Sequence, residues 1–158
     1  VCTGPGSFTG VRSSLSAART LELALPDIKL TGVSAFEAYI EDVEPDELAE
    51  VNAVIIETKR NDFYFQMFDI HKKALSNPEA LNYEEIIDKL RNHKVTFTGD
   101  GVERFLNHPS GLSLHVINMP DIPPIEALAR CGDLRWSKKN LDYPKPLYLR
   151  APDVCLKA

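Results

Sequence analysis

The chain opens with Val1-Cys2-Thr3-Gly4-Pro5-Gly6-Ser7-Phe8-Thr9-Gly10, and the interpretation of the whole sequence starts from this stretch. Two apolar residues lead into a glycine-rich turn, which is typical of a buried strand that ends in a tight change of direction. Residues 11–25 contain neither Gly nor Pro and are rich in Leu, Ala, Arg and Glu, so they predict a helix that ends before Pro26. Because the chain starts without Met at a strand end, we expect it to begin in mid-domain.

The glycine turn is a candidate anion- or nucleotide-binding loop. Glycine lets a backbone approach a ligand closely, and the start of a helix presents unpaired N–H groups. The turn nevertheless lacks the Lys of a phosphate loop, a glycine at Thr9 for a dinucleotide fingerprint, and the flanking glycines of a nucleophile elbow at Ser7. The alternative interpretation, a strained turn that binds no ligand, therefore stays open. The candidate residues are Gly4, Gly6, Ser7, Thr9 and Gly10.

The helix predicted over residues 11–25 is apolar around much of its circumference. One stripe at spacings of three and four is formed by Val11, Leu15, Ala18, Leu21 and Leu25. The apolar surface extends beyond this stripe through the apolar residues at 17, 23 and 24, and small serines stand at 13, 14 and 16. Two interpretations fit the pattern: a fully buried core helix, or a helix that packs on its own domain with one face and on a partner with the other.

The rest of the chain alternates strands and helices and predicts an α/β fold with a mixed sheet. Strands are expected at 28–33, 51–58, 63–70, 74–82, 95–98 and 112–117, and helices at 35–42, 82–90, 102–107 and 124–136. Ser34 with Glu37 and Asn82 with Glu85 have the spacing of capping boxes. The acidic loop 41–50 has room for a short helical turn, and the tail from Tyr143 is expected to be extended.

Composition narrows the class of protein. The chain has 158 residues with 18 basic and 23 acidic side chains, a formal charge of −5, so it lacks the positive field of a stand-alone nucleic-acid binder. Its longest unbroken apolar run, Ala53 to Ile56, is far too short to span a bilayer. Cys2, Cys131 and Cys155 are widely spaced and odd in number, which favours a reducing cytoplasm over disulfides or zinc.

Several other residues could carry chemistry but have simpler interpretations. Glu57 and Asp62 flank a predicted hairpin turn and are either a carboxylate pair or solvated turn charges. Trp136 with its basic neighbours Arg135, Lys138 and Lys139 is either an RNA contact or an ordinary helix C-terminus. Cys131 is expected in the core, and Tyr148 is expected to tie the tail to the body. No metal-binding spacing joins His71, His93, His108 and His115.

Taken together, these segments resemble the TsaB family, also called YeaZ. The stretch Gly4–Arg12 matches the signature GPGSFTGxR of that family residue for residue. Residues 32–38, Gly-Val-Ser-Ala-Phe-Glu-Ala, are similar to its GVSSLEA segment, and residues 146–150 match its C-terminal PxYLR. The chain departs from the family at Glu57 and Lys59, where an Asp and an Arg are usual, and it lacks the strands that precede the glycine turn.

The resemblance implies an actin-like, ribonuclease-H-like fold of two lobes, the first truncated at its N-terminus. We expect residues 1–45 to belong to the N-terminal lobe and residues 46–158 to form the C-terminal lobe. The resemblance also implies an accessory, non-catalytic role in making threonylcarbamoyladenosine on transfer RNAs that read ANN codons. The expected partners are the catalytic paralogue TsaD and the ATPase TsaE, which would supply the metal and the ATP, and this subunit would need no cofactor.

In that family the helix after the glycine turn contributes to a helical bundle with TsaD. The residues expected to bind the partner are Arg12, Leu15, Ala18, Arg19 and Glu22. Aspartate at position 15 or 18 is expected to abolish binding and leave the fold largely intact. Two other functions stay open: an actin-like ATPase or glycoprotease-like hydrolase, and a homodimer that pairs the same apolar surface with itself. Transfer RNA would be contacted only through the complex, and no membrane is involved.

Overall fold

The computed structural model describes residues 1–108, 114–116, 121–139, 141 and 143–150, with the backbone alone at 114 and 115. A five-stranded mixed sheet has the order β3-β2-β1-β4-β5. Its strands are β1 (Val51–Glu57), β2 (Asp62–Phe68), β3 (Glu79–Asn82), β4 (Val95–Thr98) and β5 (Leu114–Val116). The first three strands are antiparallel, and β4 and β5 continue the sheet parallel to β1. This is the mixed α/β sheet that the sequence predicts.

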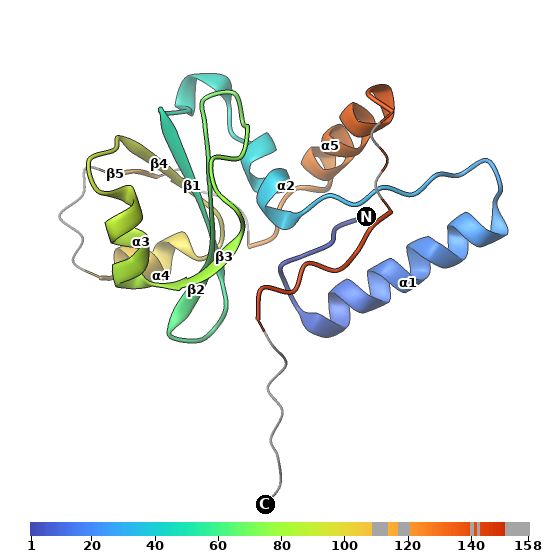
Figure 1. The fold of residues 1–158 in the computed structure, drawn as a ribbon, viewed down its shortest axis with the longest axis horizontal. Helices are drawn as coiled ribbons and strands as arrows, with labels where there is room; N and C mark the ends of the chain where they lie inside the picture. The colour runs from blue at the N-terminus through green and yellow to red at the C-terminus, as the bar shows by residue number, and fades with distance from the viewer. Residues whose placement is uncertain (109–113, 117–120, 140, 142, 151–158) are drawn as a thin grey trace, which may run out of the picture.

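Strand β1 lies in the middle of the sheet, and helices cover the sheet on both faces. Helices α3 (Tyr83–Leu90) and α4 (Val102–Leu106) lie on one face, and α2 (Ala35–Glu41) lies on the other (Figure 1). Side chains alternate along a strand. Ala53 and Ile55 therefore join the core under α3 and α4, while Val54 and Ile56 join the core under α2. The expectation that this strand is buried on both faces is confirmed.

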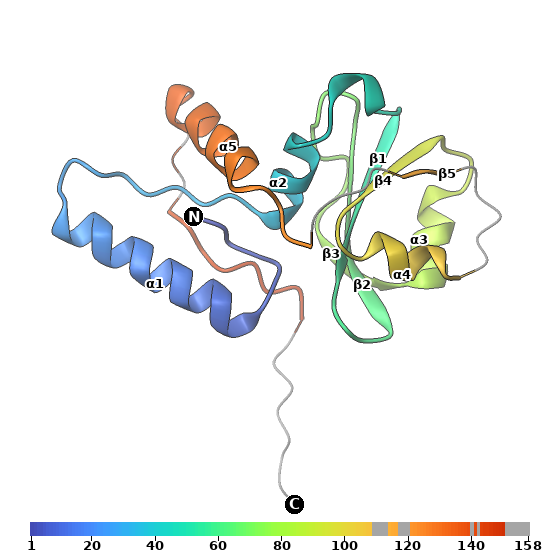
Figure 2. The same ribbon diagram turned by 180° about the vertical axis from the view of Figure 1, so that it is seen from behind.

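The remaining helices lie on the side of α2 that faces away from the sheet (Figure 2). Helix α5 (Ile125–Ser137) packs against α2, where Arg135 forms an ion pair with Glu37 and Arg130 reaches Glu41 at 3.4 Å. Helix α1 (Phe8–Ala24) lies beyond two extended segments, the N-terminal residues and the tail from residue 143 (Figure 1). The tail is joined to the first segment where the Leu147 N–H donates to the Thr3 carbonyl at 2.8 Å.

Most of the predicted elements are present, with shifts at some of their ends. Helix α1 begins at Phe8, before the expected start at 11, because the Ser7 Oγ accepts a hydrogen bond from the Gly10 N–H and caps it. Both predicted capping boxes are formed, and the acidic loop contains the short 3-10 helix η1 (Pro45–Glu47).

The strand expected at 28–33 is wrong. Only Val33 is paired, in an isolated bridge with Cys2, and residues 28–32 have no ladder partner among the described residues. Apolar residues in rough alternation do not form a strand unless a neighbouring strand satisfies their backbone groups. The ends of the predicted strand at 112–117 lie outside the described residues, and its middle is β5.

The division of the chain at residue 45 stays a prediction. Residues 125–137 and 143–150, which that division assigns to the second lobe, contact the first through α2 and Thr3. None of the helices in the described part of the chain combines the length and the apolar character needed to span a bilayer.

Candidate functional site

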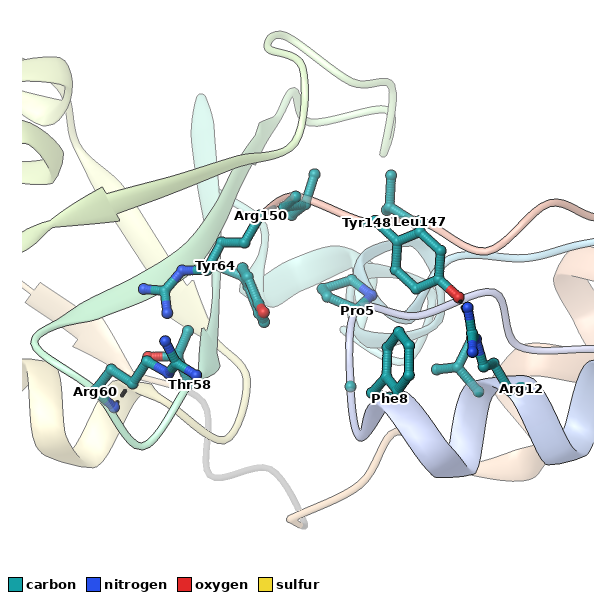
Figure 3. Close-up of a pocket in the computed structure, with 12 residues that line it drawn as sticks. Pro5, Phe8, Arg12, Thr58, Arg60, Tyr64, Leu147, Tyr148 and Arg150 are labelled. Carbon is teal, nitrogen blue, oxygen red and sulfur yellow. Dashed lines mark hydrogen bonds between the residues drawn. The ribbon is translucent and has the colours of Figure 1, made fainter. Parts of the chain in front are cut away.

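A cavity of about 590 Å³ lies between the glycine turn and the β1–β2 hairpin. The glycine turn and the first turn of α1 form one wall, the hairpin forms the opposite wall, and the tail completes the enclosure (Figure 3). The residues that line it are Pro5, Gly6, Phe8, Val11, Arg12, Thr58, Arg60, Tyr64, Leu147, Tyr148, Leu149 and Arg150. Three segments far apart in sequence therefore meet at one site.

The wall made by α1 and the tail is apolar and aromatic. The rings of Phe8 and Tyr148 lie 5.6 Å apart between centroids. The Arg12 guanidinium covers the Phe8 ring, with its Cζ 4.1 Å from the centroid, and the Arg12 Nε donates to the Tyr148 hydroxyl at 3.0 Å. This arrangement confirms that Tyr148 ties the tail to the body, and it joins the two sequence signatures, Gly4–Arg12 and residues 146–150, by direct contact.

The hairpin wall is cationic and polar. The Thr58 hydroxyl donates toward Asp62, with its Oγ1 2.6 Å from the carbonyl oxygen and 2.8 Å from Oδ1. The Arg60 N–H donates in turn to the Thr58 Oγ1 at 3.2 Å. Arg150 crosses from the tail to form an ion pair with Asp62, and its Cζ lies 6.0 Å from the Tyr64 ring centroid. The tail is thus anchored to both walls of the cavity.

Behind the hairpin, Glu57 is held by Arg104 in a two-pronged ion pair. The Arg104 Nε lies 2.6 Å from one Glu57 carboxylate oxygen, and the Nη2 lies 2.9 Å from the other. Partial burial by itself raises the pKa of Glu57, but the hydrogen bonds and charge of Arg104 and the Lys59 N–H outweigh it and leave this pKa below its ordinary value. Glu57 and Asp62 each have an arginine partner, which favours structural turn charges over a catalytic pair.

The Glu57 pair predicts a pH-dependent contribution to stability. A carboxyl whose pKa is lower in the folded state stabilises the protein above its unfolded pKa, about 4.3, and loses this contribution as the pH falls. Glu57→Gln should lower the free energy of unfolding at pH 7 by about 1 kcal/mol, the upper range for a partly exposed pair. The difference from the unsubstituted protein should shrink toward pH 3 in urea titrations.

The control for this measurement is Glu50→Gln, at an exposed position outside the sheet. Its unfolding curve should follow that of the unsubstituted protein at both pH values. If Glu57→Gln destabilised the protein equally at pH 7 and pH 3, the carboxylate charge of Glu57 would contribute nothing to the free energy of unfolding.

Most of the candidate anion-loop residues do not line the cavity. Of the five candidate anion-loop residues, Gly6 lines it, while Gly4 is buried in the backbone turn at φ +95°. Thr9 and Gly10 belong to the first turn of α1, and Ser7 already caps that turn. The role of this loop in binding an anion stays a prediction.

Comparison with known proteins places the chain in a family. The family model for TsaD, tRNA N6-adenosine threonylcarbamoyltransferase, matches residues 1–148. The chain belongs to the TsaD family. A comparison with curated protein sequences gave no significant match.

Two solved structures are similar to this member of the TsaD family. One is a Pseudomonas aeruginosa protein described as uncharacterized with similarity to peptidase YEAZ. It has a TM-score of 0.76 and 19% identity over 94% of this chain and 71% of the other. The second is YeaZ from Pseudomonas aeruginosa, with a TM-score of 0.76 and 20% identity over 93% and 70%.

These findings confirm the actin-like, ribonuclease-H-like fold and a TsaB/YeaZ-like member of the TsaD family. They support a TsaB-type role in tRNA modification.

Four of the five residues expected to bind a partner of the TsaD family make contacts within their own chain. Leu15 is buried, with 3% of its surface exposed. Arg12 holds Tyr148, Arg19 donates to the Pro144 carbonyl at 2.8 Å, and Glu22 accepts from the Leu30 N–H at 3.0 Å. Because Leu15 is buried, its substitution by aspartate should disrupt the packing of α1. This differs from the prediction from the sequence that the substitution leaves the fold largely intact. A partner role for Arg12, Ala18, Arg19 and Glu22 stays a prediction.

Three large apolar side chains of α1 are exposed, on different sides of the helix. Leu21 and Leu23 have 54% and 87% of their surfaces exposed, and Phe8, at the start of the helix, is exposed at the cavity. The interpretation of this segment as a fully buried core helix is therefore wrong for the chain described, because only Leu15 of α1 is buried. The stripe predicted from the sequence includes two residues that are exposed, Leu21 and Leu25.

The other candidate residues have structural roles. Cys131 is half-buried, and burial raises the pKa of its thiol to about 11, which keeps it protonated at neutral pH. Arg135 bonds the Gly32 carbonyl and Glu37 rather than facing outward with the exposed Trp136. Among the described residues, no three His, Cys, Asp or Glu side chains are grouped to hold a metal. Cys155 and the side chain of His115 lie outside the described residues.

Sequence reasoning missed Arg60 and the pairing of Arg150 with Asp62. Arg150 stands in a recognised motif, but its partner lies on a hairpin in a distant part of the sequence. Arg60 stands in turn sequence that gives no binding signal of its own. Only the packing of the tail between the two walls brings these residues to one cavity.

Proposed function

We propose that this chain is an accessory subunit for threonylcarbamoyl transfer to tRNA adenosine, and that it acts by docking the exposed face of α1 on a catalytic TsaD paralogue. The single observation that supports this proposal is the exposure of that face in a helix that begins in the family signature. The family match to tRNA N6-adenosine threonylcarbamoyltransferase supports the reaction.

The exposed face of α1 suits close helix packing. Small or apolar side chains recur along it at spacings of three and four, and all are exposed: Gly10, Ser13, Ser14, Ala17, Leu21 and Ala24. Small side chains let a second helix approach to the short end of the usual 8–10 Å axis separation, and Leu21 supplies an apolar anchor. We call this surface the α1 docking face.

The opposite face of α1 is held to its own chain by Leu15, by Arg12 on Tyr148 and by Arg19 on the Pro144 carbonyl. The helix is therefore presented as a braced element whose outer side is available to a partner. A braced helix loses less conformational entropy on docking than a free one.

In the proposed mechanism the docking face binds one conformation of the TsaD paralogue more tightly than another and so shifts its population toward that conformation. The partner subunits, including the ATPase TsaE, would supply the metal and ATP. Transfer RNA would be bound mainly by the partner subunits of the complex, because this chain has a formal charge of −5 and lacks a strong positive field. The cytoplasm, where transfer RNA is modified, is the proposed location.

Ala17→Arg tests the docking face. A long charged side chain at the centre of a close helix contact cannot pack, so we expect the affinity for the TsaD paralogue to fall at least 100-fold, which corresponds to about 2.7 kcal/mol. Isothermal titration calorimetry with the purified paralogue measures this change. The fold should be unaffected, because residue 17 is exposed.

Ala129→Arg is the matched control, since it makes the same substitution at an exposed alanine of α5. It should bind the paralogue as the unsubstituted chain does. Unchanged affinity of Ala17→Arg would reject the α1 docking face. Sedimentation with and without the paralogue tests the homodimer: a self-associated chain that Ala17→Arg makes monomeric, and that never binds the paralogue, would favour it instead.

A further inference from the structure

Helix α1 is attached to the rest of the chain mainly by extended segments. Within the described part of the chain, α1 has no extensive contact with another helix or strand. Its side-chain hydrogen bonds to distant residues go to extended backbone and to the tail. Arg12 and Arg19 reach the tail, and Glu22 accepts from the Leu30 N–H at 3.0 Å. The tail, which the structure describes over residues 143–150, is therefore a principal support of this helix.

The tail runs antiparallel to α1 along one face of the helix. At the start of α1, the Tyr148 ring lies 5.6 Å from the Phe8 ring, and its hydroxyl accepts from the Arg12 Nε at 3.0 Å (Figure 3). Further along the helix, Arg19 donates to the Pro144 carbonyl at 2.8 Å. A helix rises about 16 Å from residue 8 to residue 19, and an extended chain covers about 13 Å from residue 144 to residue 148. The two segments therefore match in length.

The other side of the tail is fixed to the body of the chain. The Leu147 N–H donates to the Thr3 carbonyl at 2.8 Å, and Leu147 and Leu149 pack against the core under α2. Successive side chains of an extended chain point to opposite sides. Tyr148 is therefore directed to α1 while its two neighbours are directed to the body, so the tail connects the two.

A close contact at Gly32 shows how tightly the tail is fitted to the body. A Cβ at Gly32 would lie 2.6 Å from the Thr3 Cγ2 and 2.9 Å from the Pro144 Cβ. The tail can therefore lie at this position only because residue 32 has no side chain. Pro144 and Pro146 also stiffen the tail, because each proline ring fixes its own φ angle. A stiff segment loses less conformational entropy when it is held in one place.

We propose that residues 143–150 form a strap that sets the position of α1 and so presents the α1 docking face to the partner. Tyr148 is its main positioning residue, because it contacts both Phe8 and Arg12. In a helix of 3.6 residues per turn, positions 8, 12 and 19 lie opposite positions 10, 17 and 21 of the docking face. The strap therefore acts from behind the helix. This proposal rests on the proposed function, since the surface that the strap positions is the α1 docking face.

Hydrogen exchange of the chain without its partner, followed by mass spectrometry, tests whether the strap holds α1. Tyr148→Ala removes the hydrogen-bond acceptor of Arg12 and the ring beside Phe8. We expect the amides of α1 to exchange about tenfold faster, the usual effect of losing one hydrogen bond and one aromatic contact, and those of β1 and β2 to be unchanged. Trp136→Ala is the matched control, since it truncates an exposed aromatic side chain of α5 and should leave the exchange of α1 unchanged.

Gly32→Ala displaces the strap from its other side. Gly32 is buried, so it cannot contact a partner directly. The clash of the added Cβ with Pro144 should push the strap away and raise the exchange of α1 as Tyr148→Ala does.

Calorimetry with the purified TsaD paralogue then measures the effect on docking. Tyr148→Ala and Gly32→Ala should each bind about tenfold more weakly than the unsubstituted chain, because part of the binding energy is used to order the helix. Trp136→Ala should bind as the unsubstituted chain does. Tyr148→Phe keeps the ring and loses only the hydroxyl, so its exchange and its affinity should fall between those of Tyr148→Ala and the unsubstituted chain.

Two results would overturn the strap and leave the docking face in place. One is unchanged exchange of α1 in Tyr148→Ala and Gly32→Ala. The other is faster exchange with unchanged affinity, in a chain whose binding Ala17→Arg weakens. The proposed function itself fails if the unsubstituted chain does not bind the paralogue or if Ala17→Arg binds as tightly, and the strap then has no surface to present. Exchange of β1 and β2 shows whether each variant is folded, and Tyr148→Phe decides the result if a larger change unfolds the sheet.

Discussion

Leu15→Asp should lower the free energy of unfolding by at least about 3 kcal/mol, because it removes a buried apolar side chain and places a carboxylate where only 3% of the residue is exposed. Leu15 is the only buried residue of α1. The substitution should therefore release the helix from the body rather than act on a partner surface. Urea unfolding followed by circular dichroism measures the change.

Ala17→Asp is the matched control, two residues further along the same helix on the α1 docking face. Its free energy of unfolding should stay within about 0.5 kcal/mol of the unsubstituted protein, as for most surface substitutions. If Leu15→Asp unfolded at the same urea concentration as Ala17→Asp, the inward orientation of Leu15 would be wrong. Leu15→Asp is also expected to lose partner binding. That loss would result from the loosened helix and would not show that Leu15 contacts the partner.

Gly99→Ala should be destabilising by about 3 kcal/mol or more, because it combines backbone strain with a steric clash. Gly99 follows β4 directly and has a φ of +112°, a conformation that residues other than glycine rarely adopt. A Cβ there would lie 2.2 Å from the Ile55 carbonyl oxygen of β1. The turn after β4 must approach β1 this closely because the Gly101 N–H donates to the same carbonyl at 3.0 Å.

Gly132→Ala provides the opposite control. Gly132 lies inside α5, and a Cβ there would meet nothing within 4 Å. Alanine in a helix interior is favoured over glycine, so this variant should be more stable by up to about 1 kcal/mol. Thermal unfolding of both variants measures the contrast. Equal melting temperatures for Gly99→Ala and the unsubstituted protein would contradict the described turn.

The site and the docking face lie at opposite sides of one element. The first turn of α1 places Phe8 and Arg12 at the cavity, and the outward residues from Gly10 to Ala24 form the docking face. The tail joins them, since Tyr148 bonds Arg12 and Arg150 pairs with Asp62 on the hairpin. The tail therefore contacts both α1 and the hairpin wall of the cavity.

Local sequence signals determined most of the secondary structure. Ser34 with Glu37 and Asn82 with Glu85 were sufficient to locate the starts of α2 and α3, because a capping box satisfies N–H groups within four residues of chain. The run Ala53 to Ile56 indicated a central strand, because a strand without polar alternation must be covered on both faces. The signature Gly4–Arg12 pointed to the family, which the match over residues 1–148 shows.

Only the tertiary structure decided which way these residues face and which of them meet. Periodicity grouped Leu15 with Leu21 in one apolar stripe, but one is buried and the other exposed, because the position of the body against α1 is set by contacts with residues 143–148. Residues 28–32 lacked a strand partner, which no local pattern records. The cavity arginines come together because the tail returns across the fold, and long-range packing of this kind leaves no mark on the sequence around each residue.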